Sequence, residues 1–216
     1  MRDPHVDALF YKISSDAGFS YRDPEDLHFS NDLGRFYASD GYLRVVPRED
    51  FASEADARDA IEPFLKSWEV DSDLRKSIGM LRFTFDSASV IDREPPLPGE
   101  PQIVEIEGTS HARVSAEVSL QLTCKKYPEP PKKFNATPKG MSGYRRWIRY
   151  HSGREPLQSM AYVVLTIAER SAGGRKEAAR TYQIDERILQ KLGELTSTKG
   201  DELTARKADA QEQYVP

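Results

Sequence analysis

Arginine and aromatic residues alternate between Gly143 and His151, in a stretch that is almost free of acidic side chains. From residue 125 to residue 154, nine lysines and arginines stand against one acid, Glu129. Arginines neutralise phosphates and interleaved aromatic rings stack on exposed bases, so the pattern is typical of a sequence-tolerant nucleic-acid surface. The residues that we predict to contact an anionic partner, with nucleic acid as the first candidate, are Lys125, Lys126, Lys132, Lys133, Lys139, Arg145, Arg146, Trp147, Arg149, Tyr150 and Arg154.

The charge of the chain is divided unevenly along its length. Residues 1 to 107 carry 23 acidic and 12 basic side chains, whereas residues 108 to 216 carry 12 acidic and 19 basic ones. This asymmetry indicates either an anionic partner for the second half or attraction between the halves. In the second interpretation, Trp147 and Ile148 pack inside the C-terminal part while the arginines meet carboxylates of the first half.

Arg146 and His151 are separated by four residues, which is a spacing with chemical meaning. On a helix, it can orient an imidazole for proton transfer beside a cation that stabilises a phosphorane-like transition state. The pair resembles the Arg-x4-6-His element of the metal-independent ribonucleases of the HEPN class. The resemblance covers six residues, and Trp147 stands where that element usually has a polar residue. It implies ribonuclease activity as an alternative function.

The other polar residues suggest neither a metal nor a cofactor. His5, His28 and His111 stand singly, without a second histidine or a carboxylate at a metal-ligand spacing. Gly173-Gly174 lacks the preceding strand and flanking glycines of a phosphate-binding loop, so we interpret it as a helix stop. We therefore expect no metal site, no cofactor and no assigned catalytic residue, and we lean towards a protein that is not an enzyme.

Cysteine content and hydropathy indicate the compartment. Cys124 is the only cysteine, which excludes an intramolecular disulfide, and it falls on the apolar side of a predicted strand as a small buried hydrophobe. The N-terminus lacks the pattern of a secretory signal, and the longest apolar stretch, 160–168, is too short to cross a bilayer. We expect a cytoplasmic protein without a membrane partner.

The first half of the chain shows mixed α and β patterns. Residues 6–13 predict a short helix that packs Leu9, Phe10 and Ile13. Residues 33–37 and 42–46 predict a β-hairpin, because Ser39-Asp40-Gly41 supplies the positive φ angles of a tight turn.

A long amphipathic helix is predicted to begin at Ser53, which resembles a capping-box start. Its apolar residues recur at helical spacing up to Trp68. Pro63 removes a backbone hydrogen bond in the middle, so we expect a kink or a break near Glu62.

Further strands are predicted at 80–85 and 88–91, read as one strand with a bulge or two short ones, and at 102–106. Strict alternation of apolar and polar residues then predicts a half-buried strand over 114–124. Residues 125–140 hold four prolines and five lysines, which predicts an exposed, partly extended linker.

The C-terminal part has a helical pattern throughout. Helices are predicted over 144–150, from Pro156 to about 169, over 175–182 and over 185–195, with Asp185 as an N-cap. The expected fold is α+β: a mostly antiparallel sheet with a packing helix over 1–124, the basic proline-containing linker over 125–140, and a helical unit over 141–216.

Three functions follow from these patterns. The leading hypothesis is a non-enzymatic binding or adaptor protein whose basic segment, 125–154, contacts an anionic partner. The second is a subunit of a protein assembly or a homo-oligomer, in which the acidic first half contacts another chain. The third is a HEPN-like ribonuclease that uses Arg146 and His151.

Overall fold

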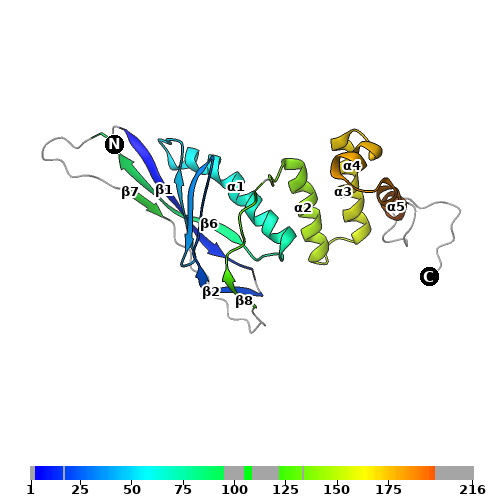
Figure 1. The fold of residues 1–216 in the computed structure, drawn as a ribbon, viewed down its shortest axis with the longest axis horizontal. Coiled ribbons are helices and arrows are strands. Elements are labelled where there is room, and N and C mark those ends of the chain that lie inside the picture. Colours follow the sequence, from blue (N-terminus) through cyan, green and yellow to red (C-terminus); the bar gives the residue numbers. More distant parts are fainter. Residues whose placement is uncertain (1–2, 17, 95–104, 109–121, 133, 198–216) are drawn as a thin grey trace. The chain divides into compact units, whose positions relative to one another are not determined.

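The structure is a computed structural model that describes residues 3–16, 18–94, 105–108, 122–132 and 134–197. The chain forms two compact units (Figure 1), the sheet unit, Met1–Ala136, and the helical unit, Thr137–Pro216. The sheet unit contains β1 (Pro4–Ser14), β2 (Phe19–Glu25), β3 (Leu27–Asn31), β4 (Gly34–Ser39), β5 (Tyr42–Pro47), α1 (Glu54–Arg75), β6 (Arg82–Asp92), β7 (Glu105–Gly108) and β8 (Leu122–Lys126). The helical unit contains α2 (Pro138–His151), α3 (Leu157–Ala172), α4 (Arg175–Tyr182) and α5 (Glu186–Ser197).

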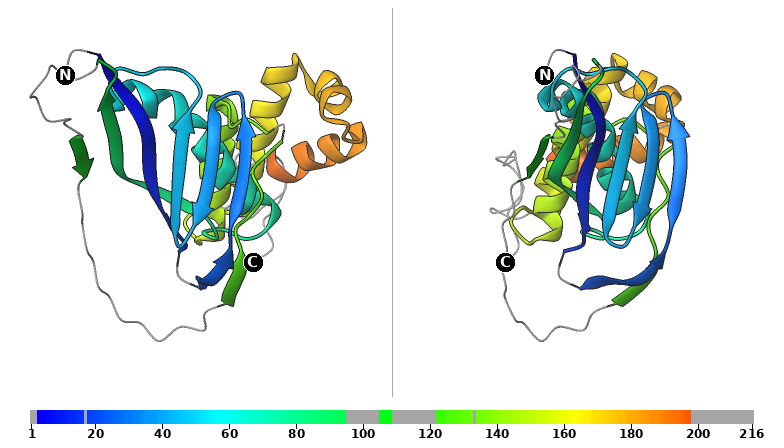
Figure 2. Two further views of the ribbon diagram at one scale, coloured as in Figure 1. Left: turned by 60° about the vertical axis from the view of Figure 1, so that its left-hand side comes forward. Right: turned by 90° about the vertical axis from the view of Figure 1, so that its left-hand side faces the viewer.

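Six strands form one sheet in the order β3-β4-β5-β1-β6-β7, and every neighbouring pair is antiparallel. A smaller sheet joins β2 to β8 in parallel. α1 covers one face of the large sheet (Figure 2), where its apolar side meets the core. The predicted α+β fold, with a mostly antiparallel sheet, one packing helix and a later helical part, is confirmed.

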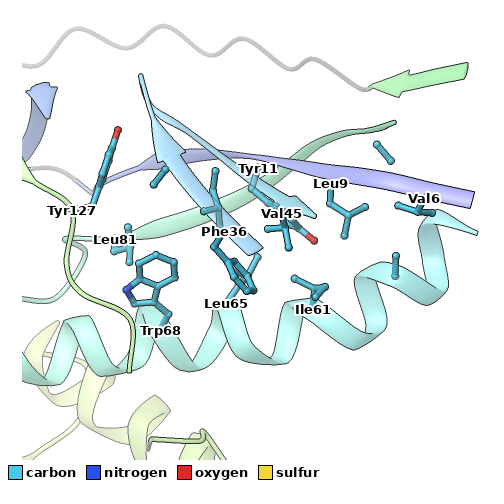
Figure 3. Close-up of a cluster of buried hydrophobic side chains, with 14 residues drawn as sticks. Val6, Leu9, Tyr11, Phe36, Val45, Ile61, Leu65, Trp68, Leu81 and Tyr127 are labelled. Carbon is cyan, nitrogen blue, oxygen red and sulfur yellow. The ribbon is translucent and has the colours of Figure 1, made fainter. Parts of the chain in front are cut away.

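The core of the sheet unit lies between the sheet and α1 (Figure 3), and it is rich in aromatic rings. Trp68 is fully buried, with its ring centroid 5.3 Å from that of Phe29 and 5.0 Å from that of Phe83. Phe36 stacks on Phe29 at 4.7 Å. Aromatic pairs of this kind contribute about 0.5–1.5 kcal/mol beyond their buried area, so this face of the sheet is held firmly to α1.

The β4–β5 hairpin confirms its prediction. Asp40 and Gly41 both have positive φ, at 50° and 79°, as a two-residue hairpin turn with matching twist requires. The Gly41 N–H also donates a hydrogen bond to the Tyr127 hydroxyl at 2.9 Å. This contact ties the turn to a residue far along the chain.

β1 corrects the prediction of a helix over 6–13. It is a central strand that pairs with β5 on one side and β6 on the other. Leu9, Phe10 and Ile13 do lie at helical spacing, but Val6, Ala8, Leu9 and Tyr11 are all buried along the strand. A bulge between Val6 and Ala8 shifts the alternation of the strand. Pairing on both edges, which a local pattern does not report, decides the conformation.

α1 begins as predicted and continues where a break was expected. The Ser53 hydroxyl accepts a hydrogen bond from the Asp56 N–H and caps the helix. The predicted break near Glu62 was wrong, because α1 is one helix of 22 residues with Pro63 inside it. Pro63 is on the exposed side, where solvent can reach the carbonyl group that loses its partner. Burial of the opposite face of α1 in the core offsets that loss.

β6 is one strand with a bulge at Asp86, as one of the two predicted alternatives proposed. The strand predicted over 102–106 falls partly within β7, and its first residues lie outside the described residues. The strand predicted over 114–124 lies mostly outside them, and only its last residues belong to β8. Cys124 on β8 is partly buried, whereas the sequence predicted a buried residue.

The stretch after β8 packs against α1, although the sequence predicted an exposed linker there. Tyr127 is only 5% exposed, and the Trp68 indole N–H donates to the Pro128 carbonyl at 3.0 Å. Further along, the Ala136 N–H donates to the Ser67 hydroxyl at 3.0 Å. Its prolines and lysines suggested exposure, but the Tyr127 ring fills the end of the core, and the Pro128 carbonyl accepts the hydrogen bond of the buried indole.

The helical unit has a small core. Leu165, Ala178 and Leu189 are buried, with Ala172, Ala179 and Leu192 packed against them. Gly173, with a φ of 90°, ends α3 as predicted, and the Asp185 carboxylate accepts from the Arg187 N–H at the start of α5. Within the described residues, no helix is long and apolar enough to span a membrane.

Candidate functional site

α2 carries most of the predicted anion-binding residues, and local sequence explains why it forms. The Thr137 hydroxyl accepts a hydrogen bond from the Gly140 N–H at 3.1 Å, and Pro138 occupies the first turn. Arg149 and His151 lie in the last turn, where positive charge is favourable. The helix has no acidic residue anywhere along its length, so it presents a positive surface without internal neutralisation.

Arg145 and Arg149 lie one turn apart on the exposed side of α2. Neither has a carboxylate partner among the residues that the structure describes. Lys139 and Arg154, near the two ends of the helix, are also exposed and likewise without a carboxylate partner in the described ranges. We call these four residues, Lys139, Arg145, Arg149 and Arg154, the basic face. Their charges are free to meet an external anion, because no internal ion pair must first be broken.

Arg146 differs from its neighbours, because it is engaged inside the helical unit. Its guanidinium donates to Glu155 Oε1 at 2.6 Å, and the Glu155 side chain is only 6% exposed. The second oxygen, Oε2, has no hydrogen-bond partner among the described residues. Removing Arg146 leaves a buried carboxylate without compensation, so this arginine supports the junction between α2 and α3.

The aromatic residues of the pattern do not share the face of Arg145 and Arg149. Trp147 lies two residues from each, about 200° around a helix with 3.6 residues per turn. Its ring centroid is 6.0 Å from that of Tyr144 and 4.6 Å from that of His151. The arginines and aromatic rings that alternate in the sequence therefore lie on different sides of the helix. A base bound beside Arg145 and Arg149 would not stack on these rings.

The side chains of Arg146 and His151 do not lie on the same side of α2. Five positions of an α-helix turn the side chains about 140° apart. Arg146 is bound to Glu155. His151 lies against the rings of Trp147 and Tyr150, and its ring centroid is 5.2 Å from that of Tyr150. A helix of this kind does not aim both groups at one phosphate.

Four of the five predicted lysines fall in the sheet unit, and only Lys139 is on α2. Lys125 and Lys126 are exposed on β8, where Lys126 is paired with Glu25 at 2.8 Å. Lys132 is exposed, and Lys133 lies outside the described residues. The basic run that is continuous in the sequence is thus divided between the sheet unit and the helical unit.

A cleft of about 890 Å³ in the sheet unit was not predicted. It lies between α1 and the first half of β6 and includes Tyr11 and Lys12 of β1. The Arg58 guanidinium sits over the Phe85 ring, 4.1 Å from its centroid. Periodicity on α1 shows which residues are exposed, but β6 becomes a neighbour only through tertiary folding.

The cations of this cleft are all paired. Arg58 donates to Glu62 and Glu54 at 2.6 and 3.1 Å. Lys12 meets Asp86 at 2.8 Å, and Lys66 meets Glu69 at 2.6 Å. The cleft is therefore poorly suited to an external anion.

Two buried polar groups in the cleft, the Glu69 carboxylate and the Tyr11 hydroxyl, differ in their hydrogen bonding. The Phe83 N–H donates to Glu69 Oε1 at 2.8 Å, so a buried carboxylate satisfies the strand edge. The Tyr11 hydroxyl has no hydrogen-bond partner among the described residues, and burial raises the pKa of Tyr11 well above its usual value. The phenol stays neutral at physiological pH and does not serve as a base there.

No group of three or more His, Cys, Asp or Glu side chains within the described ranges is arranged to hold a metal ion. No protein-family model, curated protein or solved structure matches the chain.

Proposed function

We propose that this protein binds nucleic acid through the basic face of α2, with the phosphate backbone as the contacted group. The observation that carries the proposal is the pair Arg145 and Arg149, exposed on one side of an acid-free helix and without a carboxylate partner in the described part of the chain. Phosphate contacts release counterions and do not read bases, so the binding is tolerant of sequence.

The proposal narrows the predicted set of residues. Lys139, Arg145, Arg149 and Arg154 make the contacts, and Arg146 positions α2 through Glu155. Trp147 and Tyr150 support the helix from another side, where their rings meet His151. Affinity is expected to depend on the number of phosphates that the protein neutralises and therefore on salt.

Fluorescence anisotropy with labelled single-stranded RNA and DNA, at low and physiological salt, tests the proposal. Replacing Arg145 and Arg149 by Gln together is expected to weaken binding to both strands. The negative slope of log affinity against log salt should become less steep by about 0.7 for each phosphate of a single strand that the variant no longer neutralises.

The matched control replaces Lys176 and Arg180 of α4 by Gln. These residues have the same one-turn spacing, in the same unit and with the same loss of charge, and they differ in that Arg180 is paired with Glu177. If both double variants weakened nucleic-acid binding equally, the effect would be one of overall charge, and α2 would not be the binding surface. Absence of binding even at low salt would end the nucleic-acid proposal and leave acidic proteins as the partners to test.

A further inference from the structure

Within its described residues, 137–197, the helical unit leaves more large apolar side chains exposed than it buries. Its buried hydrophobic residues are Leu165, Ala178 and Leu189. Its exposed ones are Leu157, Val164, Tyr182, Ile184, Ile188 and Leu195. Units of this size rarely obtain sufficient stability from one small core, and oligomerisation is a common remedy. These exposed residues are therefore candidates for burial against a partner.

Part of the exposed set forms a stripe on α5. Ile188 is 60% exposed and Leu195 is 43% exposed, and they are seven residues apart. Seven residues make nearly two helical turns, so both side chains point the same way about 10 Å apart. Ile184, in the turn before α5, is also exposed, at 38%. Leu189 faces the core instead, so the stripe is not turned inward.

Charges of opposite sign flank the stripe with the same spacing. Arg187 precedes Ile188 and Glu194 precedes Leu195, so both lie on one side of the stripe. Lys191 lies between the two on the same flank and is paired with Glu194 of its own helix at 3.3 Å. When the helix is reversed, the positions of Arg187 and Glu194 are exchanged, so each can meet the other in a second copy.

We propose that the α5 stripe is a homodimer interface, in which α5 of one copy packs antiparallel against α5 of a second copy. In a two-fold arrangement, Ile188 meets Leu195 of the second copy, and the reverse contact repeats on the other side of the axis. The same operation brings Arg187 to Glu194 of the second copy, which it shares with Lys191. An unrelated partner explains the apolar stripe, but it gives no reason for the order of the flanking charges.

Sedimentation equilibrium of the full chain over a wide concentration range tests the interface. Wild type is expected to form a dimer, and Ile188→Glu or Leu195→Glu is expected to raise the dimer dissociation constant by about tenfold or more. Gln190→Glu is the matched control, because Gln190 is exposed on the same helix, about 200° from Ile188. It should leave the dimer unchanged.

A charge exchange tests the register and separates a second copy from any other occupant. Arg187→Glu and Glu194→Arg are each expected to weaken the dimer, and the double variant is expected to restore it. Both residues are exposed, so the fold should tolerate the changes, and far-UV circular dichroism verifies this. A chain that stays monomeric at all concentrations overturns the proposal. A dimer that Ile188→Glu and Leu195→Glu leave intact, or whose weakening the double exchange does not reverse, overturns it equally.

Discussion

The sheet unit and the helical unit bury their apolar side chains to very different extents. The sheet unit has a continuous core of aromatic and aliphatic residues, which α1 and the stretch from Tyr127 to Ala136 close. The helical unit buries three hydrophobic residues and exposes twice as many large ones within its described part. We therefore expect the first unit to be the more stable of the two.

Separating the units should give the largest contrast. Residues 1–136 alone are expected to unfold cooperatively in urea, because their core is complete without the helical unit. Residues 137–216 alone, at low micromolar concentration, are expected to lose most of their helix signal. Far-UV circular dichroism of both fragments measures this. A sharp, cooperative transition of the second fragment at that concentration would contradict the comparison.

The two tryptophans provide the next contrast, in the full chain. Trp68→Ala is expected to lower the free energy of unfolding by about 3–5 kcal/mol, because it opens a cavity in the core and leaves the Pro128 carbonyl without its donor. Trp147→Ala, at a partly buried site, should cost about 1 kcal/mol. Urea denaturation monitored by circular dichroism compares them. Equal losses would show that the helical unit depends on its rings as strongly as the sheet unit does.

Breaking one ion pair in each unit should give a smaller difference between the units in the free energy of unfolding. Asp73 is fully buried, binds Arg82 with both oxygens and accepts from the Gly79 N–H. Asp73→Asn is expected to cost about 3 kcal/mol. Glu155→Gln should cost about 1 kcal/mol, since Arg146 is 38% exposed and can turn to solvent. Urea midpoints of the two variants decide this, and a larger loss for Glu155→Gln would reverse the ranking.

Alkaline pH should act on the sheet unit through its buried tyrosines. Burial raises the pKa of Tyr11, Tyr21 and Tyr127 above the ordinary value of about 10. Since the folded state keeps the phenols neutral, their stabilisation is complete below pH 10 and is lost as the pH rises above it.

Tyr11→Phe should reduce this alkaline loss, because it removes a phenol that ionises more easily in the unfolded state than in the folded state. The substitution breaks no hydrogen bond of the Tyr11 hydroxyl among the described residues. The free energy of unfolding at pH 8 and pH 11 measures the change. An unchanged alkaline slope in this variant would show that the other ionising groups dominate.

Removing the basic face should have the smallest effect on stability. Arg145→Gln with Arg149→Gln is expected to change the free energy of unfolding by less than about 0.5 kcal/mol, because both side chains are exposed and without a carboxylate partner in the described part. The same variant should weaken nucleic-acid binding. A large loss of stability would mean that these arginines are structural, as in the alternative interpretation of the charge asymmetry.

The features predicted correctly from the sequence depend on a few adjacent residues. The Asp40-Gly41 turn, the Ser53 cap and the end of α3 at Gly173 each need particular backbone angles or one nearby hydrogen bond. The helix predicted over 6–13 and the break predicted near Pro63 were wrong, because distant partners decide both. β1 is fixed by β5 and β6, and α1 is held by the core.

The candidate site divides in the same way. The sequence by itself determined that α2 would be basic and free of acids, because composition needs no partner. The separation of Trp147 from Arg145 follows from the helical spacing of two residues. Only the tertiary structure decided that Arg146 meets Glu155 and that Glu69 satisfies the edge of β6. Such contacts depend on which side of a helix a residue occupies and on which element packs beside it, and local spacing specifies the first far better than the second.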